Sequence, residues 1–261
     1  MAESNFSLQK TLTMLLDEKK YHSLRDILST MNPADIAAIF DDLDQACLPL
    51  LFRLLPKELA AETFVEMEPE AQELLIRGFS DSELKEVIDE LYVDDAVDIV
   101  EEMPANVVQR ILSQAEPDMR KQINEILRYP EDSAGSIMTT EYVSLRPNMT
   151  VEEAILRIRR TGIDKETIYT CYVTRGHKLI GLTSVKDLLL CEDDDATIES
   201  IMQEHVITVG TLDDKEQVAQ MFSKYNFLAL PVVDTENRLV GIVTFDDAMD
   251  VMQDAATEDM E

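Results

Sequence analysis

The sequence predicts an α+β multidomain protein in which an all-α superhelical domain of short helices precedes two copies of a small α/β module. Two observations predict this fold class. From about Leu8 to Leu127 the chain contains short apolar-periodic segments and no convincing strand. The second half repeats its own motifs after about 60 residues, and a tandem repeat of that length indicates paired supersecondary modules.

The helical half is a series of short amphipathic segments separated by turn signals. Prolines stand between these segments or at their starts, where the first turn of a helix tolerates a residue without an N–H group. This pattern predicts a compact array of helical hairpins, arranged as a right-handed superhelix. The segments are 34–43, 59–67, 84–91, 96–103 and 107–112, and the prolines are Pro33, Pro56, Pro69, Pro104 and Pro117.

The sequence Tyr-Pro-Glu-Asp-Ser-Ala-Gly-Ser at 129–136 breaks the helical pattern and marks a domain junction. The expected organisation follows from this break and from the repeat. It comprises a helical domain at 1–128, a linker at 129–136, α/β modules at 137–199 and 200–254, and a final helical segment at 255–261.

The two modules repeat their motifs in the same order. Met202 follows Met138 by 64 residues (202 − 138), whereas Gly241 follows Gly181 by 60 (241 − 181), so the first copy carries a four-residue insertion, expected near 164–167. Each copy predicts helix, β-branched strand, turn, strand and helix. The repeated motifs are Ser136-Ile137-Met138 with Ser200-Ile201-Met202, the helix starts Thr150-x-x-Glu153 and Asp213-x-x-Glu216, and segments 178–187 and 238–247.

The net charge restricts the possible partners. The 261 residues include 53 acidic and 23 basic side chains, a formal net charge of −30. Nucleic acids and anionic lipid surfaces are bound mainly through Lys and Arg, so we expect neither as a partner. Divalent cations would be attracted.

Neither a membrane span nor a secretory signal is predicted. No stretch approaches the roughly 18 to 20 apolar residues that a membrane span requires, and the first ten residues lack an apolar signal core. We therefore expect no direct membrane insertion of this segment. Cys47, Cys171 and Cys191 are scattered and odd in number, which favours a reducing, cytoplasmic compartment over a disulfide framework.

The sequence does not predict an enzyme. His22, His177 and His205 are far apart along the chain. No nucleophile motif, phosphate-cradling loop or H-E-x-x-H pattern is present.

Two predicted helices gather carboxylates on one face. At about 100° per residue, their acidic and apolar residues fall on opposite arcs. Such a face is either simply solvated or a site for hard divalent cations, for which carboxylates are the strongest protein ligands. The acids are Asp94, Asp95, Asp98, Glu101 and Glu102 in the first helix, and Asp246, Asp247, Asp250 and Asp254 in the second.

The repeated module resembles the CBS domain, and the whole chain resembles the cytosolic half of the MgtE family of magnesium channels. The G-h-h-[ST]-x-x-D signature at 181–187 and 241–247 carries the first resemblance. The second rests on the acidic helical domain, the sequence of 129–143, Leu-Pro-Val-Val-Asp at 230–234 and Ala-Thr-Glu-Asp at 256–259. It implies that 255–261 begins a connecting helix into a transmembrane pore domain outside this chain, at the cytoplasmic face of the cell membrane.

The resemblance also implies sites for Mg²⁺, for which another hard divalent cation could substitute. Sites between the helical domain and the CBS pair would use Glu62, Asp94, Asp98, Asp214 and Asp247, with a backbone carbonyl near Gly135 and Ser136. Sites toward the connecting helix or pore would use Glu216, Asp250, Glu258 and Asp259. Asn226 and Ala255 depart from the family pattern; an Asn226 carbonyl can ligate an ion, but it adds no charge.

A second ligand and a partner are also implied. Ser184 with Asp187, and Thr244 with Asp247, can hold the phosphate and ribose of an adenine nucleotide such as ATP. The same residues are equally explained as helix N-caps, each contributing about 1 kcal/mol. Because Asp247 is assigned to the metal, we expect any nucleotide at Ser184 and Asp187.

The CBS pairs should form a homodimer, with Met249 and Met252 as candidates for its interface.

Three functions remain open. The first is a magnesium-sensing domain that gates a magnesium channel when Mg²⁺ bridges acidic surfaces of the helical domain and the CBS pair. The second is a CBS-pair adenine-nucleotide sensor, and the third is an acidic helical adaptor without ion sensing. The acidic helix at 94–102 favours the first over the second, and the closing Ala-Thr-Glu-Asp favours it over the third.

Overall fold

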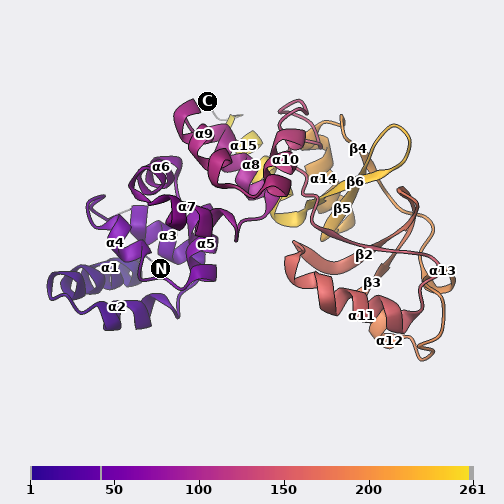
Figure 1. Cartoon of the computed structure of the whole chain (residues 1–261), viewed down its shortest axis with the longest axis horizontal. Coiled ribbons are helices and arrows are strands. Elements are labelled where there is room, and N and C mark those ends of the chain that lie inside the picture. Colours follow the sequence, from indigo (N-terminus) through magenta and orange to yellow (C-terminus); the bar gives the residue numbers. More distant parts are fainter. Residues whose placement is uncertain (1, 42, 259–261) are drawn as a thin grey trace. The chain divides into compact units, whose positions relative to one another are not determined.

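The structure is a computed structural model that describes residues 2–41 and 43–258. It divides into two compact units (Figure 1), of which the first comprises the residues up to Leu91 together with Asp95–Arg120. The second comprises Tyr92–Asp94 and the chain from Lys121 onward. The predicted fold class is confirmed, since a series of helices is followed by two small α/β modules.

In the described residues before the linker, all regular structure is helical. The five predicted segments overlap α3, α5, α7, α8 and α9, although four of them extend one to three residues past the observed helix ends. Three of the five prolines are the first residue of a helix and two, Pro56 and Pro104, are N-cap residues. The helices are α1 (Ala2–Asp17), α2 (Tyr21–Leu28), α3 (Pro33–Asp41), α4 (Leu48–Phe52), α5 (Lys57–Val65), α6 (Pro69–Gly78), α7 (Asp81–Ile88), α8 (Val93–Glu102), α9 (Ala105–Gln114) and α10 (Pro117–Ile126).

Aromatic packing and ion pairs hold the helices of the first unit together. The ring of Phe52 lies 6.1 Å from that of Phe64 and 5.4 Å from that of Phe79. At the surface, Arg53 donates to Glu83 at 2.6 Å. That bond, followed by one from the Ser80 backbone, lowers the pKa of Glu83 to about 2. Glu83 and Ser80 also form a capping box at the start of α7.

The second unit contains the same sheet topology twice. In each sheet the first strand runs parallel to the middle strand, which pairs antiparallel with the third. The strands are β1 (Tyr142–Leu145), β2 (Thr167–Arg175) and β3 (Lys178–Ser184), then β4 (Val209–Gly210), β5 (Ala229–Val233) and β6 (Leu239–Thr244). The helices are α11 (Val151–Thr161), the 3-10 helix η1 (Gly162–Asp164), α12 (Val185–Leu190), α13 (Ile198–Ile201), α14 (Lys215–Tyr225) and α15 (Phe245–Glu258).

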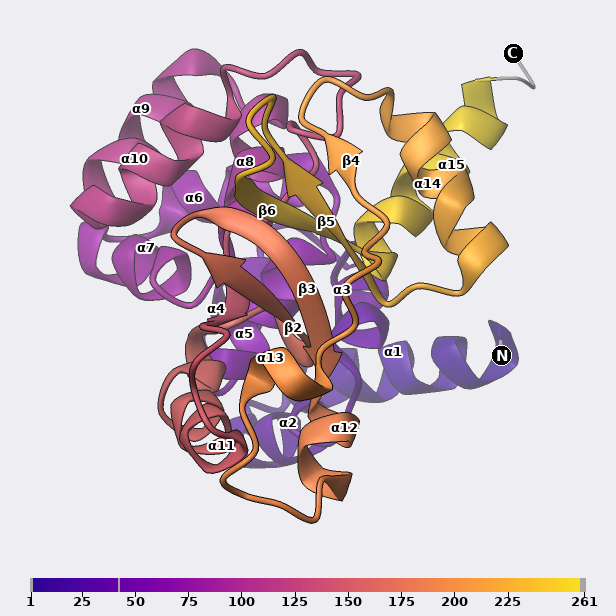
Figure 2. The same ribbon diagram turned by 90° about the vertical axis from the view of Figure 1, so that its right-hand side faces the viewer.

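The two sheets pack against each other, and β2–β3 lies beside β5–β6 in Figure 2. Tyr172, Leu179, Val233 and Ile242 form the buried layer between them. The sequence did not identify β1 and β4. One predicted helix start was wrong by one residue: Asp214, not Asp213, is the N-cap of α14 and accepts from the Gln217 N–H at 3.0 Å.

Each Ser-Ile-Met motif packs against the sheet of the other module. Thr139, after the first motif, exchanges two backbone hydrogen bonds with Ile242 of β6, at 2.8 and 2.9 Å. Gln203, after the second, does the same with Leu182 of β3, at 3.0 and 2.8 Å. A Cβ atom at Gly241 would lie 2.8 Å from the Thr139 carbonyl oxygen, so this close approach requires glycine.

None of the described helices combines the length and apolar character needed to cross a lipid bilayer.

Candidate metal and nucleotide sites

Asp247 is a predicted ligand whose surroundings disfavour a negative charge. It lies in the first turn of α15, and its half-buried carboxylate accepts a hydrogen bond from the Thr244 hydroxyl. Burial, together with the nearby charges of Asp246 and Asp250, raises the pKa of Asp247 to about 6 against the opposing effect of the Thr244 hydrogen bonds. A cation beside Asp247 would relieve the unfavourable energy of this charge.

The linker runs along the start of α14, within the second unit. Ala134 and Gly135 donate backbone hydrogen bonds to Asp213 and Thr211, at 2.7 and 2.9 Å. The buried Ser136 hydroxyl donates to the Glu131 carbonyl at 2.7 Å and lies 2.9 Å from a second carbonyl oxygen of the turn. The Ser136 side chain is therefore engaged by the linker itself, which leaves the backbone as the expected ligand at this position.

Helix α8 contributes one buried and one exposed predicted ligand. Asp94 is only 6% exposed, whereas Asp98 is exposed. The backbone N–H of Val93, in the first turn of α8, donates to the Glu141 carboxylate at 3.0 Å. Burial raises the pKa of Glu141, against the effect of this hydrogen bond. The sequence did not indicate that Glu141 caps α8, because its partner lies 48 residues away.

The remaining predicted ligands are distributed over the surface. Glu62, Glu216 and Asp250 are exposed, as is Asp214, whose carboxylate also caps α14. Asn226 has a left-handed backbone, with φ of 53°, and ends the same helix. Asparagine is favoured in that conformation, which gives Asn226 a structural role that the sequence analysis missed. The side chain of Glu258 and the whole of Asp259 lie outside the described residues.

Across residues 2–41 and 43–258, no three His, Cys, Asp or Glu side chains lie close enough together to hold a metal ion. The structure therefore does not bring the predicted ligands into such a cluster. Magnesium commonly retains several waters and uses one or two carboxylates, so single acids such as Asp247 suit it better than they suit an ion that requires a full protein cage.

The nucleotide candidates form a hydrogen-bonded hydroxyl–carboxylate pair in each module, and Ser184 is the N-cap of α12. The Ser184 hydroxyl donates to the Asp187 carboxylate at 2.6 Å and accepts from the Asp187 N–H at 3.0 Å. Thr244 and Asp247 repeat the carboxylate contact. Thr170 of β2 lies opposite Ser184 in the sheet. The exposed Asp187 carboxylate remains accessible to a ligand hydroxyl, whereas Asp247 is more buried.

Family profiles match most of the chain. The profile described as the MgtE intracellular N domain matches residues 31–132, and the CBS domain profile matches 134–192 and 198–254. The magnesium transporter MgtE of Thermus thermophilus is 39% identical over 97% of this chain, and that of Bacillus subtilis is 31% identical over 96%. The chain spans 57% and 55% of the lengths of these two relatives.

Two solved structures resemble this one over nearly their whole length. The cytosolic domain of the Mg²⁺ channel MgtE, in complex with ATP, has a TM-score of 0.87 at 38% identity and covers 93% of this chain and 99% of its own. The soluble part of a magnesium transporter has a TM-score of 0.86 at 32% identity and covers 98% of this chain and 100% of its own. The chain therefore belongs to the MgtE family and comprises its intracellular N domain followed by a CBS pair.

Proposed function

We propose that this chain is the magnesium-sensing regulatory region of a magnesium transporter. The observation that carries the proposal is Asp247, a half-buried carboxylate beside Asp246 and Asp250 whose pKa is raised to about 6. Such a group is costly to ionise in the folded protein, and a divalent cation offsets that cost directly. The net charge of −30 adds a long-range attraction for cations.

The ion would act by favouring one arrangement of the two units. Among the predicted ligands, Glu62 and Asp98 belong to the first unit, whereas Asp94, Asp214, Asp247 and the backbone at Gly135–Ser136 belong to the second. Without an ion these like charges repel by about 1 kcal/mol per close pair at a high effective dielectric. An ion that takes ligands from both units binds only the arrangement that offers both sets, and this differential affinity shifts the population.

In the longer protein, this shift would control transport. The relatives extend beyond the matched region, and α15 would continue through Glu258 and Asp259 into a connecting helix and a pore domain. High cytosolic Mg²⁺ would then close the pore. The role is regulatory rather than catalytic, and the segment would lie at the cytoplasmic face of the membrane.

Small-angle scattering and limited proteolysis at 129–136 test the proposal over a titration from 0 to about 10 mM Mg²⁺. We expect the radius of gyration and the cleavage rate to fall with magnesium. Asp98→Asn/Asp247→Asn should abolish most of the response. Glu152→Gln/Glu204→Gln, which removes the same charge from exposed positions of the CBS pair, should retain it. A response equal in both double variants would refute ion bridging and would indicate general screening.

A homodimer is part of the proposal. Several large apolar side chains remain exposed on the helices of the CBS pair, including Leu189 at 64%, Leu190 at 69% and Met249 at 44%. An identical pair related by a two-fold axis could bury them. Sedimentation at about 20 μM should give a dimer; a monomer with and without magnesium would contradict this.

ATP is a second candidate ligand, favoured by the solved relative described in complex with ATP. We place it at Ser184 and Asp187, because Asp247 serves the metal. Calorimetry should show ATP binding that Asp187→Ala abolishes and Thr244→Ala retains. The reverse pattern would assign the nucleotide to the second module.

A further inference from the structure

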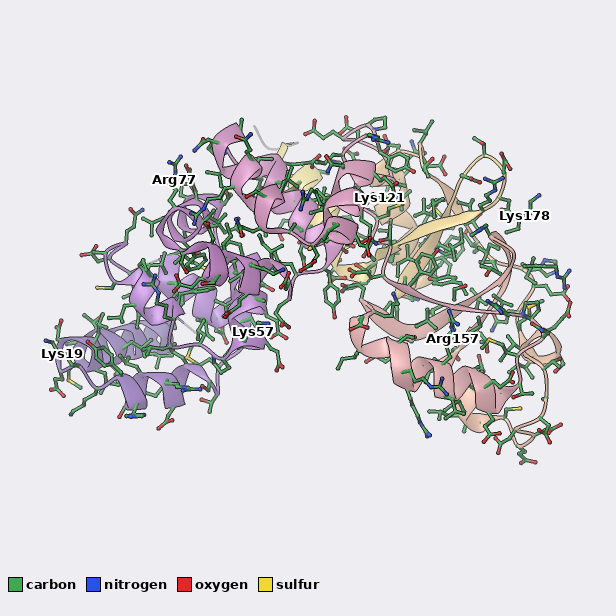
Figure 3. All side chains as sticks on the ribbon, viewed as in Figure 1. Lys19, Lys57, Arg77, Lys121, Arg157 and Lys178 are labelled. Atoms are coloured by element: carbon green, nitrogen blue, oxygen red, sulfur yellow. The ribbon has the colours of Figure 1, made fainter. Side chains whose placement is uncertain are left out.

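A cavity of about 790 Å³ in the first CBS module has positively charged walls, although the chain as a whole is strongly acidic. It lies at the turn end of the β2–β3 hairpin, where the β1–α11 loop, α11 and α13 meet. Arg146 comes from the loop, Arg157 from α11 and Arg175 from the end of β2. Figure 3 labels Arg157 and also Lys178, the first residue of β3 beside the turn. We call this space the arginine cavity.

The arginine cavity contains more cationic than anionic groups. Its one carboxylate, Glu199, pairs with Arg175 at 2.5 Å. In the described part of the chain, Arg146 and Arg157 take part in no ion pair. All three arginines are exposed at the mouth of the cavity, so an anion could reach them from solvent.

The second module provides an internal comparison. Equivalent positions follow from the matching strand registers and helix N-caps. Arg146 corresponds to Gly210, Arg157 to Met221 and Arg175 to Asp234, so the second module has no cation at any of them. The module therefore folds without these arginines, and a structural requirement of the fold does not explain them.

The floor of the cavity can donate hydrogen bonds to a ligand. The hydroxyls of Ser144 and Thr174 lie 3.0 Å apart, and the bond between them uses only one of their two hydrogens. The other hydrogen can be donated to an oxygen of the ligand. Tyr142 donates to the Leu239 carbonyl at 3.3 Å, and both side chains give that part of the cavity an apolar surface.

We propose that the arginine cavity binds a small phosphorylated compound. Guanidinium groups match the geometry and charge of phosphate. The three guanidinium groups around the cavity carry more positive charge than its single carboxylate neutralises. The volume lies within the range of ordinary small-molecule pockets. Ser184 and Asp187 lie at the other end of β3 from the hairpin turn, so this site and the nucleotide candidate are separate.

Substitution of Glu199 should change anion binding in the opposite direction from substitution of the arginines. An exposed ion pair such as Arg175–Glu199 is weak, so a phosphate group can replace the carboxylate on Arg175. Removing the Glu199 charge should therefore strengthen anion binding. If the charges of Arg146 and Arg157 alone attracted anions to the cavity, removal of the Glu199 charge would change the anion affinity much less.

Calorimetry of the 261-residue chain with inorganic pyrophosphate, in metal-free buffer of low ionic strength, tests the site. Arg146→Gln/Arg157→Gln should weaken binding about tenfold or more, as expected for the loss of charge-assisted hydrogen bonds. Arg159→Gln/Arg160→Gln, which removes the same charge from positions of α11 outside the cavity, should change it less than twofold. Glu199→Gln should strengthen it about threefold, and Asp187→Ala should leave it unchanged.

Other outcomes would overturn the assignment. Equal effects of the two double-arginine variants would show non-specific attraction, and no detectable binding to the unmodified chain would refute the site. Co-sedimentation with phosphatidic acid vesicles, lost in Arg146→Gln/Arg157→Gln, would assign the cavity to a lipid headgroup instead. None of these results depends on the response to magnesium, so this proposal can fail while the proposed sensing function stands.

Discussion

Replacing Asp247 with asparagine should stabilise the metal-free protein near neutral pH. The carboxylate is ionised there despite its partial burial and despite the charges of Asp246 and Asp250. Asparagine removes the charge and keeps an oxygen that can accept the Thr244 hydrogen bonds. The variant should therefore retain the hydrogen bonds from Thr244 while losing the unfavourable desolvation of the charge.

The expected magnitude follows from proton linkage. Burial, with the charges of Asp246 and Asp250, raises the pKa of Asp247 from 3.8 to about 6. The folded chain holds the Asp247 proton more tightly than the unfolded chain does. Protonation of Asp247 therefore stabilises the fold, and this contribution is complete below about pH 4. It is lost as the pH rises through 6. A shift of this size corresponds to at most about 3 kcal/mol, and we expect about 1 to 2 kcal/mol because the side chain is partly exposed.

Thermal unfolding with EDTA at pH 5, 6, 7 and 8 measures this effect. Asp247→Asn should raise the unfolding temperature of the second unit by about 2 to 6 °C at pH 8, and by less at pH 5. Asp254→Asn, on the exposed part of the same helix, is the matched control and should have little effect. Saturating Mg²⁺ should raise the unfolding temperature of the unmodified chain by more than it raises that of the Asp247→Asn variant. A variant less stable than the unmodified chain at pH 8 without metal would refute the reasoning.

Three further changes test the fold. Gly241→Ala should destabilise the second unit by about 1 to 3 kcal/mol in urea, because the new Cβ would meet the Thr139 carbonyl at 2.8 Å, whereas Gly78→Ala, with no atom within 4 Å, should be neutral or stabilising. Glu83→Gln should lower the unfolding free energy of the first unit by about 1 kcal/mol at pH 7. Since the pKa of Glu83 is lowered to about 2, the stability difference between variant and unmodified chain should disappear as the pH falls from about 4 toward 2. A difference that does not depend on pH would contradict the ion pair. Asn226→Gly should be tolerated, but Asn226→Val should cost about 1 kcal/mol of unfolding free energy or more, and equal stability would argue against the left-handed cap.

The sequence predicted those features that depend on local chemistry. Prolines marked the starts of five helices, and the offsets between repeated motifs located the insertion close to η1. Strands β1 and β4 were missed because they are short, only four and two residues. The N-cap of α14 was misassigned because Asp213 and Asp214 are adjacent and equally suitable by type.

Long-range features were not predictable from these patterns. A helical wheel placed Asp94 and Asp98 on one acidic arc, but it could not show that Asp94 is buried. Nor could the spacing of the Ser-Ile-Met motifs show which sheet each would join. The arginine cavity escaped notice because its cations come from three separate segments, each of which is ordinary as local sequence.

The exchange of Ser-Ile-Met motifs makes the two CBS modules interdependent for folding. Met138 belongs to the core of the second module and Met202 packs on that of the first, so each module lacks part of its own core when isolated. The pair should therefore unfold as one cooperative block, with no intermediate in which a single module is folded. A single module expressed alone could complete its core only by accepting the motif of an identical copy, and would then fold only as a domain-swapped dimer.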